Sequence, residues 1–284
     1  ISLRRYGSAV ELLIERASRR HRLTLKDLLT GNLKADVSVE INRYINELHD
    51  VGATGVKDFI GAELDFQVNS LQKATKDFYK VAAPTRPELE RAILSSPLKI
   101  KGTSTVSPEM DEAFRRLGTS NITAVNAKIR RGIVKGQSES EIIADVLKSS
   151  KLTENQAKTL VITNLTQAET IVKTKIVEAN SAVVKGYVFT AILDSRTSET
   201  CRHYDDLFQT VDNVKVRPPL HWRCRSTLVP VLKSASELQR TQHPLLDSTA
   251  VDPTKATGEL PIRETLDDWL RRQAFSTQVN YLGS

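Results

Sequence analysis

The stretch Gly186-Tyr-Val-Phe-Thr-Ala-Ile-Leu193 marks a change in the character of the chain. Its β-branched and aromatic residues predict a strand over 187–193, and a second such run predicts another strand over Ser226–Leu232. Polar and turn-forming residues fill the interval between the two runs. Together they predict a short β-hairpin or sheet unit near residues 186–232.

Before residue 186, apolar residues recur at the three- and four-residue spacing of helices. Two such sets are Val10, Leu13, Ile14 and Ala17, and Val39, Ile41, Ile45 and Leu48. A longer run through Leu71 predicts a helix that lasts until Pro84, and Ser107-Pro108-Glu109 predicts a later helix start. Capping boxes at Ser138-x-x-Glu141 and Thr153-x-x-Gln156 predict two more starts, the second opening a helix over 153–182.

These patterns predict a mainly α protein with a small α+β module. We divide the chain into a helical N-terminal region over 1–115, the module over 116–235, and a C-terminal part over 236–284. The C-terminal part is predicted to be an extended linker followed by a terminal helix. Trp269 and Leu270 lie on the apolar face of that helix and are candidate docking residues.

Composition excludes several classes of protein. With 39% hydrophobic and 26% charged residues in 284, the chain has enough apolar material for a core and is not a disordered segment. No apolar run approaches the roughly 20 residues that span a bilayer. Two cysteines exclude a disulfide scaffold.

The formal net charge of +7 is concentrated in a few places. Residues 1–35 hold eight Lys and Arg against three acids, and residues 215–240 hold six against Glu237 alone. Arg16–Arg22 and Ile129–Lys135 are further basic segments. They lack interleaved aromatic residues, which excludes base stacking on single strands. Sequence-independent contact with double-stranded DNA stays open, beside the alternative of a solvated helix face.

The densest group of reactive side chains lies between the two predicted strands. Cys201-x-His203 and His221-x-x-Cys224 supply four nitrogen and sulfur donors, which is the number that a tetrahedral zinc site needs. Three alternatives stay open: packed free thiols without a metal, structural zinc, and a Cys201–Cys224 disulfide. We expect no cofactor, with zinc as the alternative.

Enzymatic signatures are absent from the sequence. It contains neither the H-E-x-x-H of zinc proteases nor the H-x-E and P-C-x-x-C pair of zinc deaminases. A Cys nucleophile with a His base would require Cys201 to approach His221, or Cys224 to approach His203. We therefore expect a protein that is not an enzyme, with a Cys/His-based hydrolase or toxin-like enzyme as an alternative.

Two further segments flank the Cys/His group. Asp194 and Arg196 follow the first predicted strand, and we expect them to form a local carboxylate–guanidinium pair that fixes a turn. Pro218 and Pro219 precede His221 and favour an extended backbone there.

In these two segments the chain resembles the head morphogenesis family typified by protein F of phage Mu. The matching residues are Asp194, Arg196 and Thr197, then Pro219, His221, Cys224 and Arg225. The C-terminal Trp269-Leu270 segment is similar to a tail common in that family, and the resemblance covers about 115–283. Ser198 and Ser226 stand where relatives often carry cysteine.

The resemblance implies a minor structural protein of a tailed-bacteriophage head. Its partners would be the portal protein, the major capsid protein or both, and it would assist DNA packaging or ejection. It would reside in the virion, in the head interior or at the portal vertex, and in the host cytoplasm during assembly. An injected virion protein that binds DNA without sequence preference is the alternative.

Overall fold

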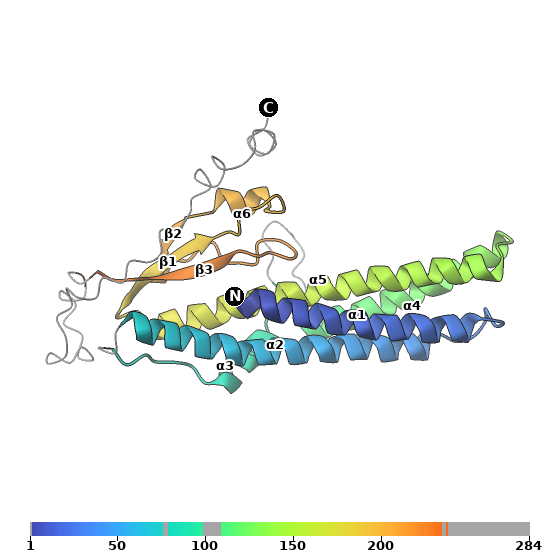
Figure 1. Ribbon diagram of the computed structural model, residues 1–284, viewed down its shortest axis with the longest axis horizontal. Helices are drawn as coiled ribbons and strands as arrows, with labels where there is room; N and C mark the ends of the chain where they lie inside the picture. Colours follow the sequence, from blue (N-terminus) through green and yellow to red (C-terminus); the bar gives the residue numbers. More distant parts are fainter. Residues whose placement is uncertain (1, 76–78, 99–108, 235–236, 238–284) are drawn as a thin grey trace, which may run out of the picture. The chain divides into compact units, whose positions relative to one another are not determined.

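The computed structural model describes residues 2–75, 79–98, 109–234 and 237. Its α-helices are α1 (Ser2–Leu29), α2 (Ser38–Ala74), α3 (Arg86–Leu94), α4 (Met110–Val134), α5 (Glu139–Ala179) and α6 (Glu199–His203) (Figure 1). Its strands are β1 (Val184–Thr190), β2 (Phe208–Thr210) and β3 (Thr227–Leu232), with a 3-10 turn, η1, at Val211–Asn213. The prediction of a mainly helical fold with a small β-containing module is confirmed. Most of the predicted helix start at 107–109 lies outside the described residues. The predicted terminal helix with Trp269 and Leu270 lies wholly outside them.

Contacts between residues group the chain into two compact units. The helical unit comprises residues 1–62 and 87–168, and the sheet unit comprises 63–86 and 169–284. Both α2 and α5 therefore contribute residues to each unit. The domain boundaries at residues 115 and 235, which rest on sequence patterns, stay predictions.

The core of the helical unit lies between α1, α2, α4 and α5. Gly52 of α2 shows how closely these helices pack, because a Cβ atom there would lie 2.7 Å from side-chain atoms of both Met110 and Val161. The apolar side chains that are fully buried in this unit include Ile14, Leu25, Ile41, Tyr44, Leu48, Phe59 and Val161. Among the described helices, none combines the length and the apolar character that crossing a membrane requires.

The helix α5 begins where the sequence predicts one start and continues through another. At Ser138 the backbone N–H donates to the Glu141 carboxylate at 2.8 Å, and the Glu141 N–H donates to the Ser138 hydroxyl at 3.4 Å, so this capping box is confirmed. The capping box at Thr153 is wrong, because Thr153 lies inside α5 and its hydroxyl donates to the Ser149 carbonyl at 3.2 Å. No glycine or proline in 139–152 interrupts the helix.

The helix α2 ends ten residues earlier than Pro84. The hydroxyl of Thr75 donates to the Leu71 and Gln72 carbonyls at the last turn. The Gln72 side chain then donates to the Tyr79 carbonyl and accepts from the Val81 N–H. These bonds satisfy backbone groups of an irregular segment that a continued helix would have paired internally.

The sheet is antiparallel with the order β2-β1-β3. The predicted first strand is displaced: β1 begins at Val184 and ends at Thr190, because the next N–H, of Ala191, donates to the Asp205 carboxylate at 2.8 Å. The second predicted strand matches β3 to within one residue. Pro230 of β3 pairs with Tyr187 of β1. Because β3 is an edge strand, it tolerates a residue without an N–H.

Gly186 permits the close approach of β1 and β2. A Cβ atom at this position would lie 2.2 Å from the Gln209 carbonyl oxygen and 2.8 Å from the Phe208 ring. We expect Gly186→Ala to lower the free energy of unfolding of the sheet unit by roughly 1–3 kcal/mol, as overpacked sites do.

Thermal or urea unfolding measures this change. Gly118→Ala in α4 is the matched control, because its Cβ would meet Ile45 at an ordinary 3.4 Å. Equal midpoints for the two variants would contradict the steric role of Gly186.

Candidate functional site

The turn after β1 is built around Asp194. Its carboxylate accepts from the Arg196 N–H at 2.8 Å, and its own N–H donates to the Thr197 hydroxyl at 2.8 Å. The Thr197 hydroxyl donates in turn to the Ile192 carbonyl. These local bonds explain why an Asp and a Thr stand three residues apart in this turn.

The carboxylate of Asp194 also reaches a distant partner. Both terminal nitrogens of Arg225 donate to it at 2.6 Å, whereas a guanidinium nitrogen of Arg196 lies 3.7 Å away. The predicted local pair with Arg196 is present at this longer distance, and the main partner of Asp194 is Arg225, 31 residues further along the chain. The hydrogen bonds from Arg225 outweigh the effect of burial and hold the pKa of Asp194 well below its usual range.

The short helix α6 places Cys201. Ser198 precedes the helix, and its hydroxyl accepts from the Cys201 N–H at 3.2 Å, as an N-cap does. Cys201 consequently lies in the first turn of α6, where its side chain is 2% exposed.

A loop supported by Gln209 places the other two residues. The buried Gln209 amide accepts from the N–H groups of Lys215 and Val216 and donates to the Val216 carbonyl. Beyond this loop the Cys224 N–H donates to the His221 carbonyl at 3.2 Å, which closes a tight turn just before β3.

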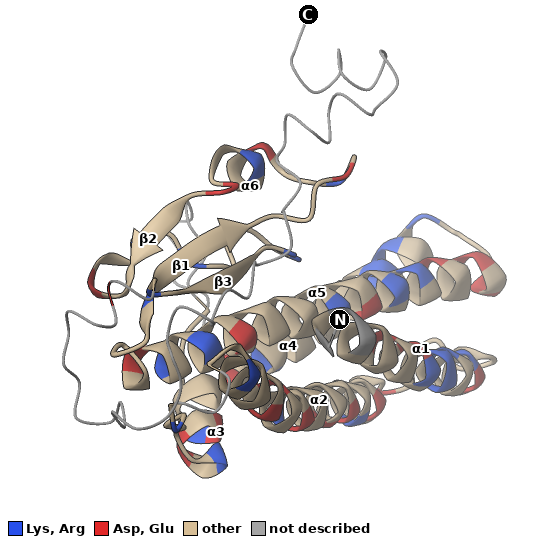
Figure 2. Ribbon diagram, turned by 60° about the vertical axis from the view of Figure 1, so that its left-hand side comes forward, with Lys and Arg blue, Asp and Glu red and all other residues tan. Residues whose placement is uncertain are grey.

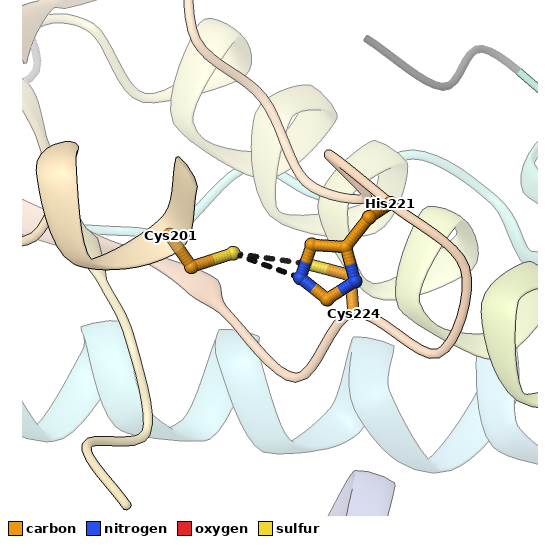
Figure 3. A group of neighbouring side chains, drawn as sticks. All are labelled: Cys201, His221 and Cys224. Carbon is orange, nitrogen blue, oxygen red and sulfur yellow. Dashed lines mark hydrogen bonds between the residues drawn. The ribbon is translucent and has the colours of Figure 1, made fainter. Parts of the chain in front are cut away.

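Three of the four donors predicted from the sequence meet in the sheet unit. Cys201 Sγ lies 3.1 Å from His221 Nε2 and 3.7 Å from Cys224 Sγ (Figure 3). Their ligand atoms all lie within 4.8 Å of one another, and among the described residues this is the group suited to a metal ion. His203 is not part of it, since its ring packs edge-on against Tyr204 instead.

The surroundings of the two sulfurs shift their pKa values in opposite directions. Hydrogen bonding from Cys201 lowers the pKa of the Cys224 thiol to about 4, with further help from His221 and from the amides of Leu220 and Ser226. The same contact with Cys224, together with burial, raises the pKa of Cys201, and Cys224 also raises the pKa of His221. The surroundings therefore favour a negative charge on Cys224 over one on Cys201.

Both cysteines are free thiols in the structure. A disulfide would require the sulfurs to lie about 2.05 Å apart, well inside the observed 3.7 Å. The contact between Cys201 and His221 is also within the range of a nucleophile and its base. The geometry thus allows metal binding, sulfur oxidation and nucleophilic chemistry.

The Asp194 turn and the Cys/His group lie in a part of the chain that is similar to a known family. Residues 123–229 match the phage Mu protein F-like family. This match confirms the resemblance over these residues, and the similarity of the Trp269-Leu270 segment, which lies outside them, stays a prediction. The search of curated proteins found no match, and the search of solved structures found none either.

The phage Mu protein F-like region extends from within α4 to within β3. The family indicates a phage head morphogenesis protein with capsid-related partners. The residues that carry the resemblance, from Asp194 to Arg225, all lie within residues 123–229. They differ from one another in burial and in hydrogen-bond partners. Arg225 pairs with Asp194, Pro219 is buried, and the Arg196 side chain is 78% exposed.

Sequence reasoning missed the roles of three residues around the Cys/His group. Gln209 holds the loop before His221, Ser198 caps α6, and Ser226 is buried beside Cys201. A serine three residues before Cys201 is a signal that could have revealed the cap of α6. The role of Gln209 depends on residues that only the folded loop brings near it.

Proposed function

We propose that the protein is a minor structural component of a tailed-phage head, associated with the portal vertex or the capsid interior during assembly. The observation that carries this proposal is the phage Mu protein F-like match over residues 123–229, which includes every residue of the Asp194 turn and the Cys/His group. In this role the Asp194–Arg225 pair and the Cys/His group stiffen a module that docks onto a larger assembly. The protein needs no catalytic activity to act in this way.

The burial of the two sulfurs supports a non-enzymatic role. Cys201 is 2% exposed and Cys224 is fully buried, so the Cys224 sulfur has no surface from which to attack a substrate. Reactive cysteines combine a low pKa with partial exposure, and here the low-pKa sulfur lacks the exposure. The hydrolase alternative is therefore less well supported than the structural one.

The surroundings of the basic segments weigh against a DNA-binding face on α1. Arg20 pairs with Glu47, and Arg22 pairs with Glu154 at 2.8 Å, so part of the charge of Arg16–Arg22 is neutralised within the protein. Acidic and basic residues both lie along α1, α2 and α5 (Figure 2). Injection with the genome is accordingly the second candidate.

Quantitative mass spectrometry of purified particles tests the proposal. We expect a few copies per particle in DNA-filled heads, and the same number in heads emptied of DNA. Cross-linking inside the intact particles should join the protein to the portal or the major capsid protein.

Two results would contradict this expectation. Loss of the protein together with the genome would replace portal association with ejection. Absence from the particles altogether would remove the structural role. The major capsid protein, measured in the same samples, is the control for particle recovery.

A further inference from the structure

The distances within the Cys/His group fit a tetrahedral metal centre and are too long for a disulfide. Two thiolates bound to one tetrahedral zinc lie about 3.8 Å apart, because each Zn–S bond is about 2.3 Å long. The sulfurs of Cys201 and Cys224 are 3.7 Å apart. A thiolate and an imidazole nitrogen on the same ion would lie about 3.5 Å apart, so His221 would need to withdraw by a few tenths of an ångström.

The imidazole of His221 is held in the orientation that a metal ligand requires. Its Nδ1 lies 2.8 Å from the Trp222 carbonyl oxygen, which can only accept, so Nδ1 carries the proton. In the neutral ring Nε2 then has a free lone pair, and this lone pair faces the sulfurs (Figure 3). A backbone carbonyl that fixes the second nitrogen in this way is the common outer partner of metal-binding histidines.

The surroundings of the sulfurs suit two thiolates on one cation. Backbone amides of Leu220 and Ser226 donate to the Cys224 sulfur, and the hydroxyls of Ser198 and Ser226 face the Cys201 sulfur. Such donors hold thiolates in place without competing as cations for the site. The donor set of two sulfurs and one imidazole is soft, and it favours zinc over magnesium or calcium.

We infer that Cys201, His221 and Cys224 bind one zinc ion, with water as the fourth ligand. The ion would join α6 to the turn before β3, two segments separated by 20 residues or more. Each thiol gives up its proton to the solvent when it binds, and no redox change takes place. The inference concerns the folded chain alone and does not depend on the proposed role in the phage head.

Metal analysis of the full chain tests this inference. The protein is purified under reducing conditions without chelator, supplied with Zn²⁺, passed through a desalting column and measured by mass spectrometry of the element. We expect close to one zinc per chain in the wild type, and loss of that zinc in Cys224→Ser and His221→Ala. His203→Ala is the matched control, because this histidine lies outside the group, and it should retain the full zinc content.

Cobalt binding to the wild-type chain gives a readout that does not depend on whether the variants fold. Co²⁺ added to the wild-type chain should produce the intense thiolate-to-cobalt absorption and the visible bands of a tetrahedral site. One equivalent of Zn²⁺ should then displace it. In folded His221→Ala protein we expect the affinity for Co²⁺ to fall more than about 100-fold, beyond the effect of losing an outer partner.

Three results would overturn the inference. The first is two titratable thiols with no zinc and no cobalt spectrum in the wild type, which would mean packed free thiols. The second is the absence of titratable thiols without metal, which would mean a Cys201–Cys224 disulfide. The third is equal loss of zinc in His203→Ala and His221→Ala, which would exclude the proposed ligand set. Whether the protein is present in phage particles is measured separately, so either proposal can fail while the other stands.

Discussion

Replacing Glu154 with alanine is expected to lower the free energy of unfolding of the helical unit by roughly 3 kcal/mol. The Glu154 side chain is fully buried in α5 and accepts from Arg22 at 2.8 Å and from Lys151 at 2.7 Å, while Lys158 lies 3.0 Å away. Breaking a buried ion pair costs about 3–5 kcal/mol, because the partners lose their counter-charge. We expect the lower end, since Arg22 and Lys151 are partly exposed and can turn toward water.

Urea unfolding followed by circular dichroism measures this loss. Glu15→Ala is the matched control: Glu15 also pairs with Lys158, at 2.6 Å, but its side chain is 45% exposed. Exposed pairs contribute about 0–1 kcal/mol, so this variant should stay near the wild type. Similar losses in the two variants would show that burial of Glu154 does not decide the cost.

The same carboxylate should make stability depend on pH. Burial alone would raise the pKa of Glu154, but the hydrogen bonds from Lys151, Arg22 and Lys158 lower it from 4.5 to about 2. A pKa that is lower in the folded state stabilises the protein above the unfolded value and loses this effect as the pH falls through the folded value. Stability from this group should therefore decline between about pH 4.5 and pH 2, and Glu154→Gln should reduce that decline.

The second large effect is expected at Arg225. Its guanidinium makes two hydrogen bonds of 2.6 Å to Asp194, whereas Arg196 lies 3.7 Å from the same carboxylate and is 78% exposed. Hydrogen bonds to charged groups contribute about 1.5–3 kcal/mol, and we expect a loss of roughly 2 kcal/mol in Arg225→Ala because both side chains are partly exposed to solvent.

Arg196→Ala provides a comparison within the same motif. It removes an arginine from the same carboxylate, yet the backbone N–H of residue 196 still donates to Asp194. Its unfolding midpoint should stay close to that of the wild type. A larger loss in Arg196→Ala than in Arg225→Ala would contradict the assignment of Arg225 as the main partner of Asp194.

The sequence is most informative about features that neighbouring residues decide. The capping box at Ser138 and the strand that contains Pro230 were predicted, because side-chain type and spacing within a few residues control them. The identical pattern at Thr153 failed because a hydroxyl can equally well bond to the preceding helical turn. Short elements such as β2 and α6 contain three and five residues, too few for a periodic signal.

The candidate site was predicted in composition but only partly in geometry. The spacing of residues in the sequence does not distinguish His203 from His221 as a ligand. In the structure only His221 lies beside the two sulfurs. The selection depends on the loop that Gln209 supports and on the carbonyl of Trp222. Likewise, the guanidinium nearest to Asp194 in sequence is not its main partner, since chain folding carries Arg225 to it across 31 residues.

Residues 123–229, which match the family, belong to both compact units and do not form one unit by themselves. A fragment that starts at residue 123 would lack α1, α2 and the first half of α4. The surface of α5 around Val161, which packs on Gly52, would then be exposed to water. The first 60 residues therefore complete the core of the helical unit, although the family match does not include them. If residues 123–229 were moved to another protein, other helices would have to pack on the exposed surface of α5.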